Sequence, residues 1–511
     1  DDVGPGDAQN IMGSLEGMAV VREGVTAVVI LAKFTGLNQS PHPTIHDENT
    51  VSQGRSNRVV FGRHGGHFPS WAGTVADVRA RRMLNQTAGD SMGWSRRLNR
   101  AATHGTVPFL FHLEVVSVEA DPRVMLAQKL RTHCESCMPA MQKLYEALVG
   151  IASPTEDVAA NQRCLKLISQ ALQTIGFAVT ELPTEAGHVH LLARRQGEGE
   201  SIPLILVGHV DTVHPASEGF KGLRIDGTRA VGPGVADMKG GLIVMLTMLD
   251  ALVALGVVEA LDVRVFVSTD EERQSSSSCA FLEKASKGAE IGLVFDSARP
   301  DGAVVGSRRA TGRFQFEIEG RGAHAGEGGH AGRSAIQEAV VLVQRIEALN
   351  DPARGVSFNC GVLRAGTEAT VIPAAATLIV DARCDRDEDM AWVEEKMKAL
   401  ANESVRGCLT TVTGSMGRPV WPESFETLQL YDIWLEAAES LGLGAIELTD
   451  AGAGSDANLL HSYGISTLDG LGPVGGELHT EKEWVELSSI PERAALSALS
   501  ILMWLHRRSE G

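Results

Sequence analysis

The chain of 511 residues carries 46 lysines and arginines against 64 aspartates and glutamates, a net charge of −18, and 43% of its residues are hydrophobic. A chain of this length exceeds what one hydrophobic core usually organises, so two or more domains are expected. The hydrophobic content excludes a disordered or fibrous protein, and the acidic excess disfavours nucleic acid as a partner because it repels phosphates.

The first segment, residues 1–124, is rich in glycine, histidine and arginine and shows no sustained helical or strand periodicity. We assign it no fold, and a disordered extension and an artefactual leader ahead of a start at Met125 are both open. No export signal is recognised, because Arg22 and Glu23 split the early apolar stretch, so a cytoplasmic location is favoured. The histidines of this segment lack the clustering of metal ligands: His42, His46, His64, His67, His104 and His112.

The seven cysteines are too few, and odd in number, for a disulfide framework, which favours a reducing compartment. Cys134 and Cys137 form a C-x-x-C pair. No second pair with zinc-ribbon spacing follows, and the stretch lacks the βαβ pattern that accompanies redox motifs. We therefore interpret both side chains as structural or incidental thiols.

From residue 125 to residue 309 helices and strands alternate, which indicates an α/β domain. Helices are predicted over Met141–Val149 and Asn161–Ile175, and strands over Ala178–Leu182 and His188–Leu192. Three further aliphatic segments have the composition of strands that are covered on both faces of a mainly parallel sheet: Leu204–Val207, Val263–Val267 and Ile291–Phe295.

The most apolar stretch of the chain is Gly241–Leu261, which Asp250 and Glu259 interrupt. It lies between two predicted strands and is better explained as a buried helix than as a membrane span. We therefore expect no membrane partner.

Between residues 310 and 417 the pattern reads strand, helix, strand, strand, helix, strand, which is the order of a ferredoxin-like unit inserted into the first domain. The predicted elements are Arg313–Glu319, Ser334–Leu349, Val356–Leu363, Ala375–Arg383, Asp387–Ala401 and Leu409–Thr413. Residues 418–511 return to the α/β pattern as the second part of the first domain. Their last helix is predicted to begin with a capping box of Ser489 and Glu492.

Each of the three buried strands leads to a side chain that can bind a metal. The first leads to His209, the second to Glu271 and Glu272, and the third to Asp296. Catalytic groups of open α/β sheets collect beyond the carboxyl ends of the strands. These side chains are therefore expected to converge.

His209 alone would more often be a hydrogen-bonded structural histidine than a ligand. Asp211 lies two residues further on, a spacing that puts both side chains on one side of extended backbone, so its carboxylate is expected to orient the imidazole. Glu271 and Glu272 would ordinarily be a solvated pair, but buried carboxylates need a metal or protons to neutralise them. Since neighbours in extended backbone point opposite ways, one can bind a metal while the other faces the bound water.

Asp237 stands in Gly-Pro-Gly-Val-Ala-Asp237-Met-Lys-Gly-Gly, just ahead of the apolar helix. By itself the segment reads as a helix N-cap with flexible glycines. The glycines also allow close backbone packing around a buried carboxylate that bridges two ions. Both interpretations stay open on the local pattern.

These segments resemble the co-catalytic dizinc exopeptidases and deacylases, the family that includes the glutamate carboxypeptidases and the acetylornithine and succinyl-diaminopimelate deacylases. The resemblance covers roughly Met125 to the carboxyl terminus. It implies an α/β catalytic domain with helices around a mainly parallel sheet, and an inserted ferredoxin-like α+β dimerisation domain. Five motifs carry it, in order: His209-x-Asp211-Thr-Val, Gly-Pro-Gly-x-x-Asp237-x-Lys-Gly-Gly, Asp270-Glu271-Glu272, the lone acid Asp296 and the near-terminal His479.

The resemblance implies two Zn²⁺ ions in the catalytic domain, which would be formed by residues 125–309 and 418–511. Ligands of nitrogen and oxygen without thiolate suit zinc, and cobalt or manganese can substitute. The implied roles are His209 and Asp296 on one ion, Glu272 and His479 on the other, Asp237 bridging both, and Glu271 as general base.

The resemblance also implies that the inserted domain pairs two subunits and that His324, in Gly-Ala-His324-Ala-Gly, stabilises the oxyanion in the partner's site. Arg383 and Arg418 match positions near the substrate's terminal carboxylate, which arginine binds bidentately. Two surface arginines are the alternative. The loop that holds Gly452 and Gly454 resembles a substrate-lining loop whose backbone amides can seat an anion.

We therefore predict a homodimeric dizinc metallohydrolase that cleaves a C-terminal peptide or amide bond of a small substrate with a free carboxylate. An N-acyl-amino-acid deacylase is the first alternative, and a non-catalytic metal-stabilised binding protein is the second, which the retention of Glu271 disfavours. Thr370 and Asp296 depart from the glutamate carboxypeptidases, which carry asparagine and glutamate there. The change at Thr370 affects a residue expected to help bind substrate.

Overall fold

The computed structural model describes residues 121–197, 201–215, 222–327 and 331–510, together with the backbone of three earlier strands. The chain divides into two compact units, Asp1–Asp121 and Pro122–Gly511. The first unit, which the sequence pattern left without a fold, contains an antiparallel sheet of β1 (Glu16–Glu23), β2 (Thr26–Thr35) and β3 (Leu110–Glu119). The sequence analysis interpreted the amino-terminal histidines as lacking the clustering of metal ligands. Their side chains lie outside the part of the chain that the structure describes: His42, His46, His64, His67, His104 and His112.

The larger unit contains a six-stranded sheet with the strand order β19-β10-β6-β9-β5-β4. The three predicted buried strands are its β6 (Ile202–His209), β9 (Leu261–Ser268) and β10 (Ile291–Val294), which lie side by side and run parallel. β19 (Ser466–Leu468) adds a further parallel strand on one side. β5 (Val189–Gln196) and β4 (Ala178–Pro183) pair antiparallel on the other side.

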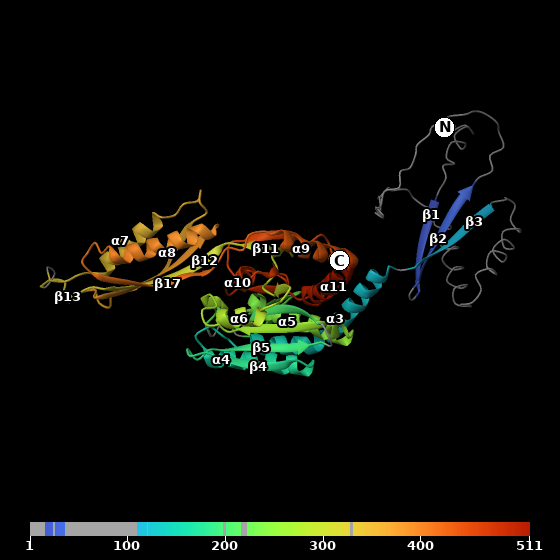
Figure 1. Cartoon of the computed structure of the whole chain (residues 1–511), viewed down its shortest axis with the longest axis horizontal. Helices are drawn as coiled ribbons and strands as arrows, with labels where there is room; N and C mark the ends of the chain where they lie inside the picture. The colour runs from blue at the N-terminus through green and yellow to red at the C-terminus, as the bar shows by residue number, and fades with distance from the viewer. Residues whose placement is uncertain are drawn as a thin grey trace, which may run out of the picture. The chain divides into compact units, whose positions relative to one another are not determined.

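Both faces of this sheet are covered by helices, because successive side chains of β6 pack alternately into two hydrophobic cores. Leu204 and Leu206 pack in one core, and Ile205 and Val207 pack in another, because successive strand residues point to opposite faces. The first core includes side chains of α3 (Pro122–Val149), α4 (Val158–Thr174), α5 (Gly241–Ala254), α9 (Phe425–Ser440) and α11 (Ser489–Glu510). The second includes side chains of α6 (Cys279–Ser286) and α10 (Asp456–Ser462). The predicted α/β class is confirmed (Figure 1).

The apolar stretch forms the helix α5, which is almost entirely buried, followed by the short 3-10 turn Val257–Ala260. No helix within the described ranges is both long and apolar enough to cross a membrane. The hydrophobic run is therefore a core helix, as its charged residues indicated.

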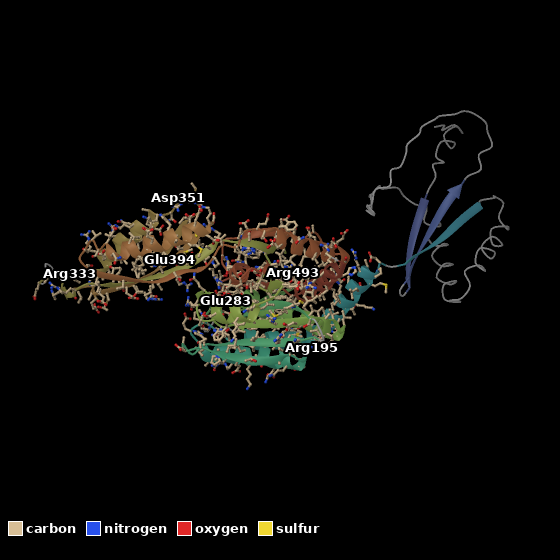
Figure 2. The ribbon with its side chains drawn as sticks, viewed as in Figure 1. Arg195, Glu283, Arg333, Asp351, Glu394 and Arg493 are labelled. Atoms are coloured by element: carbon tan, nitrogen blue, oxygen red, sulfur yellow. The ribbon has the colours of Figure 1, made fainter. Side chains whose placement is uncertain are left out.

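The residues between 310 and 418 form a second, four-stranded antiparallel sheet with the order β14-β16-β12-β17. Its elements are β12 (Ala310–Glu319), α7 (Ala335–Glu347), β14 (Ser357–Ala365), β16 (Ala375–Cys384), α8 (Asp387–Asn402) and β17 (Leu409–Arg418). This sheet and the two helices have a hydrophobic core of their own. Figure 2 labels Glu394 of α8 and Arg333, which precedes α7.

The capping box predicted for the last helix is wrong. The Ser489 hydroxyl donates to the carbonyl of Glu486 and accepts from the amide of Val474. It therefore ties the helix start to a neighbouring loop. A capping box does form at α10, where Ser455 and Asn458 satisfy each other's backbone amides.

Candidate active site

The carboxyl ends of β6, β9 and β10 bring four of the predicted side chains to one edge of the sheet. His209 is the last residue of β6, Glu271 and Glu272 follow β9, and Asp296 follows β10. Parallel neighbours end at the same edge, so residues far apart in sequence meet there.

Two further side chains reach this edge from other elements. Asp237 lies in the irregular turn Val235–Gly240 (η3) that leads into α5, and His479 lies in the loop after β20 (Gly475–Gly476). His479 has a positive φ of 63°, a conformation that non-glycine residues seldom adopt. The loop backbone thus turns sharply at this histidine.

Asp237 stands between the two histidines. Its Oδ1 is 3.2 Å from His209 Nε2, and its Oδ2 is 3.2 Å from His479 Nε2. Asp296 Oδ1 lies 3.9 Å from His209 Nε2, and Glu272 Oε2 lies 3.5 Å from His479 Nε2. The side chains therefore form two adjoining groups that share one carboxylate.

The composition of these groups fits two divalent cations. Within each group the ligand atoms lie within 4.8 Å of one another, one group being His209, Asp237 and Asp296 and the other Asp237, Glu272 and His479. Glu272 Oε1 is buried, and no described residue donates a hydrogen bond to it. Imidazole and carboxylate donors are a set that zinc binds well. These are the same two sets that the family resemblance implied.

Three carboxylates of the site lie where burial disfavours their charge, whereas hydrogen bonds from both histidines lower the pKa of the fourth, Asp237. Burial raises the pKa of Glu271 well above its ordinary value, and burial and the nearby Asp237 raise the pKa of Glu272. Burial and the neighbouring Asp469 raise the pKa of Asp296 to about 8. Cations at this position would remove the repulsion that favours protonation.

The pKa values of the two histidines are raised as well, because neighbouring carboxylates stabilise the charged imidazole. Hydrogen bonds to Asp237 and Glu272 raise the pKa of His479 to about 11. Burial lowers the pKa of His209, but Asp211 and Asp237 outweigh it and raise that pKa well above its ordinary value. Both shifts therefore favour the protonated, charged imidazole in the metal-free protein.

We expect the metal-free protein to release protons when it binds two divalent cations near neutral pH. Both imidazoles must lose a proton to become ligands, and so must the Asp296 carboxyl, whose pKa is raised to about 8, so at least two protons should leave when both ions bind. Affinity should fall as the pH falls, because protons compete better for groups whose pKa is raised. The slope of the binding enthalpy against the ionisation enthalpy of the buffer measures this release, and a slope of zero would contradict it.

Asp211 has a second role beside the expected one. Its carboxylate lies 3.4 Å from His209 Nδ1, and its carbonyl oxygen lies 2.9 Å from the same nitrogen. The carboxylate also accepts the backbone amides of Glu271 and Glu272, each at 3.2 Å, and the hydroxyl of Thr155. Its closest contacts thus fix the turn that carries both glutamates.

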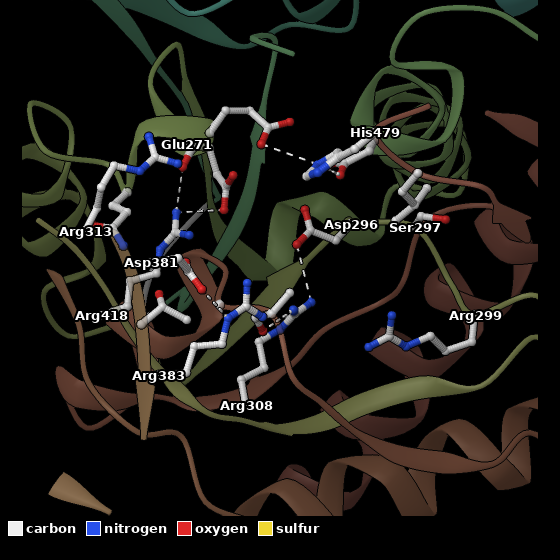
Figure 3. Close-up of a pocket in the computed structure, with 17 residues that line it drawn as sticks. Glu271, Asp296, Ser297, Arg299, Arg308, Arg313, Asp381, Arg383, Arg418 and His479 are labelled. Carbon is white, nitrogen blue, oxygen red and sulfur yellow. Dashed lines mark hydrogen bonds and ion pairs between the residues drawn. The ribbon is translucent and has the colours of Figure 1, made fainter. Parts of the chain in front are cut away.

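That turn also corrects the expected backbone of the two glutamates. Glu271–Arg273 is a 3-10 turn and not extended chain. The side chains nevertheless diverge. Glu271 Oε1 contacts Arg418 at 2.7 Å (Figure 3), whereas Glu272 Oε2 lies 3.5 Å from His479 Nε2. Glu271 Oε2 is 3.9 Å from His209 Nε2, so this carboxylate lies beside the ligand groups.

Arg418, which the resemblance places near the substrate carboxylate, is held by several groups of the protein. It is buried and donates to the Glu271 carbonyl at 2.9 Å and to Ser275 Oγ at 3.1 Å. It also lies 3.5 Å from the buried carboxylate of Asp456. This ion-pair network orients Glu271.

Two further buried networks escaped the sequence analysis. Arg308 contacts Asp296 at 3.4 Å and the buried Asp469 at 2.7 Å. Glu483 is fully buried and accepts the amides of Ala236 at 2.8 Å and Asp237 at 3.0 Å. Neither had a local signal, since an arginine and a glutamate in isolation read as surface residues. Both hold a candidate ligand in place.

A cavity of about 300 Å³ opens beside the ligand groups. Arg383 and Gly454, two of the predicted substrate residues, line it together with Arg418. Gly452 does not line it, but its carbonyl accepts from Arg383 at 2.7 Å. The cavity has basic residues that the sequence analysis did not single out: Arg299, Arg308 and Arg313.

His324 and Thr370 lie elsewhere in the chain. His324 belongs to a separate two-stranded sheet, in which β13 (Ala323–His324) pairs with β15 (Val371–Ile372), and Thr370 directly precedes β15. Both side chains are exposed and neither lines the cavity. Their predicted roles across a dimer stay predictions.

Residues 205–502 match peptidase family M20/M25/M40. Carboxypeptidase G2 of a Pseudomonas species is 32% identical over 384 residues, covering 71% of this chain and 89% of that protein. The succinyl-diaminopimelate desuccinylase of Leptothrix cholodnii is 25% identical, covering 68% of this chain and 94% of that protein. The structure of human carnosine dipeptidase 1 matches with a TM-score of 0.61 at 16% identity, covering 74% of this chain and 99% of that one, which shows the shared fold.

The mixed six-stranded sheet, the two candidate metal groups at its edge and these likenesses define a class, the metal-dependent peptidases and amidohydrolases. The chain belongs to peptidase family M20/M25/M40, whose match spans more than half of it. The resemblance expected from the motifs is thereby confirmed.

Proposed function

We propose that this protein is a dizinc carboxypeptidase that removes a C-terminal residue from a small substrate with a free carboxylate. The observation that carries the proposal is the cavity itself, in which Glu271 and both candidate ligand groups face a set of arginines. The likeness to carboxypeptidase G2 points the same way.

In this proposal His209, Asp237, Glu272, Asp296 and His479 hold the cations, and Glu271 moves the proton. When bound, the two cations polarise the scissile carbonyl and lower the pKa of a water molecule. The Glu271 carboxylate takes a proton from the attacking water and passes it to the departing amine nitrogen. Arg418, which contacts both the carbonyl and the carboxylate of Glu271, keeps that side chain in position.

Arg383 is the arginine best placed to bind the substrate carboxylate. Its side chain is 34% exposed and lines the cavity, whereas Arg418 is buried against Glu271. Its Nε donates to Asp381 at 2.7 Å and one terminal nitrogen to the Gly452 carbonyl at 2.7 Å. No described residue accepts from the other terminal nitrogen, which can donate to an anion.

Arg383→Ala should raise KM for a free-carboxylate substrate by roughly 10- to 100-fold, the value of a charged hydrogen bond. The carboxamide analogue of the same substrate should be little affected, because it has no charge to lose. Kinetics on C-terminal dipeptides, folyl-glutamate and N-acyl amino acids test this and the substrate class together. Arg224→Ala, on the exposed side chain of Arg224, is the control.

Two results of that panel would contradict the proposal. Equal loss on the acid and its amide would remove Arg383 from carboxylate binding. Preference for N-acetyl or N-succinyl amino acids would favour the deacylase alternative, which the likeness to the desuccinylase supports.

The proposal includes a homodimer paired through the inserted domain. β14 is an outer strand of the described four-stranded sheet, and outer strands offer unpaired backbone groups. Apolar side chains are exposed on α7 and on β14, namely Ile336, Val340 and Leu363 at 39%, 46% and 44%. Exposed apolar patches of this kind mark interfaces.

His324 is suited to donate a hydrogen bond in the partner's site. The backbone amides of Gly326 and Glu327 both donate to His324 Nδ1 at 3.2 Å. Nδ1 is therefore an acceptor, and the neutral ring carries its proton on Nε2. The Nε2–H group can therefore donate a hydrogen bond, which is the interaction that stabilises an oxyanion.

We expect His324→Asn to lower kcat by about 10²-fold, the value of one oxyanion donor. Mixing His324→Asn with Glu271→Gln subunits should restore about half of the wild-type activity in hybrid dimers, because one site then has both groups. Purification of hybrids with two different tags and comparison with each homodimer measures this. Hybrids no more active than the homodimers would show that His324 does not act across the interface.

A further inference from the structure

A half-buried cluster of unlike side chains lies away from the active site, between α3 and α5. His133 and Cys137 are one helical turn apart on α3 and share a face. Asp250 comes from α5, which packs against α3. Asp250 Oδ2 is 2.8 Å from His133 Nε2 and 3.2 Å from Cys137 Sγ.

Asp250 is the single charged residue of α5, and a carboxylate in an apolar helix needs compensation. Among the ion pairs of the described residues, His133 is its one partner. No lysine or arginine of the described part of the chain pairs with Asp250. The cluster therefore has no permanently charged cation to neutralise this carboxylate.

The three ligand atoms have the chemistry and spacing of a zinc site. They lie within 4.8 Å of one another, and atoms around a tetrahedral zinc are separated by ~3.3–3.8 Å. Thiolate, imidazole and carboxylate are ligands that zinc and cobalt accept together, whereas magnesium and calcium prefer oxygen. A fourth position can be filled by water, since the cluster is partly exposed.

We propose that His133, Cys137 and Asp250 form a third cation site, which takes Zn²⁺ or Co²⁺ and fastens α3 to α5. The C-x-x-C pair thereby divides, because Cys134 is fully buried in the core while Cys137 faces the cluster. Asp250 lies about 13 Å along α5 from its start beside Asp237. The site is therefore separate from the two candidate catalytic groups.

Cobalt distinguishes this site from the active site, because the catalytic groups contain no sulfur. We expect the full chain, freed of metal and reduced, to develop a near-ultraviolet thiolate-to-cobalt charge-transfer band that is complete once three equivalents of cobalt have been added and has the amplitude of one thiolate-bound ion per chain. Cys137→Ser should lose that band yet keep two bound cobalt ions and full hydrolytic activity. Zinc in excess should raise the Tm of the parent protein more than that of Cys137→Ser.

Cys360→Ser is the matched control. Cys360 is also half-buried, and its thiol hydrogen bonds to the carboxylate of Glu347. Within the described residues it belongs to no candidate metal group. It should keep the band. His133→Asn and Asp250→Asn should each lower the cobalt affinity measured from the charge-transfer band by at least 10-fold. These two variants replace Cys137→Ser as the test if that variant misfolds.

Three outcomes would overturn the proposal. The parent protein could show no charge-transfer band with three equivalents of cobalt. The band could persist in Cys137→Ser, or it could vanish equally in Cys360→Ser. The weak visible bands of cobalt in the active site report in every case that the protein is folded.

Discussion

Glu271→Gln is expected to bind two metal ions and to lose about 10⁴-fold in kcat, the upper part of the range for general acid and base catalysis. The amide has the shape of the carboxylate but accepts no proton. Glu271 acts twice in the proposed reaction, first on water and then on the leaving amine. The loss should therefore appear in kcat, with KM little changed.

The neighbouring residue provides the contrast. Glu272→Gln changes the same side-chain type one residue away, but Glu272 faces His479 and belongs to a candidate ligand group. It should lose bound metal as well as activity. Metal analysis of both variants beside their kinetics separates the roles, and a fully active Glu271→Gln would refute the proposed mechanism.

Asp237→Asn is expected to reduce the bound metal from two ions to one or fewer and to lower kcat by at least 10³-fold. Its two oxygens face different histidines, each at 3.2 Å. Asparagine has one carbonyl oxygen and an amide nitrogen that cannot bind a cation, so one ion loses its bridge. Removal of the metal pair costs several kcal/mol of transition-state stabilisation, and each 1.4 kcal/mol is tenfold in rate.

The control for this variant is Asp381→Asn, which changes a carboxylate that lines the same cavity but pairs with Arg383. It should retain both metal ions. Metal content after dialysis, measured by mass spectrometry, and activity with added zinc are the two readouts. Two tightly bound ions in Asp237→Asn would show that Asp237 does not bridge them.

Much of the fold was predictable because its signals are local. Short aliphatic runs identified β6, β9 and β10, and the strand-helix order of residues 310–417 matched the four-stranded sheet with α7 and α8. Helix α3 extends much further towards the amino terminus than predicted, since its first turns have little amphipathic pattern. The strands before residue 121 gave no usable periodicity.

The sequence by itself determined which residues stand at the strand ends, because a run of adjacent aliphatic residues identifies each buried strand. These residues are His209, Glu271, Glu272 and Asp296. Only the tertiary structure decided what those residues contact. The Asp237 carboxylate meets His479 across 242 positions, and Glu483 reaches the Asp237 amide across 246.

Such contacts arise from the packing of whole elements, so no local pattern contains them. The same holds for Arg418, which the resemblance associated with substrate and the structure pairs with Glu271 at 2.7 Å. It holds again for Cys137 and Asp250, which are 113 positions apart in the sequence and are brought together by the packing of α3 on α5. Residue types specify the chemistry that is available, and the packing of the chain specifies where it is assembled.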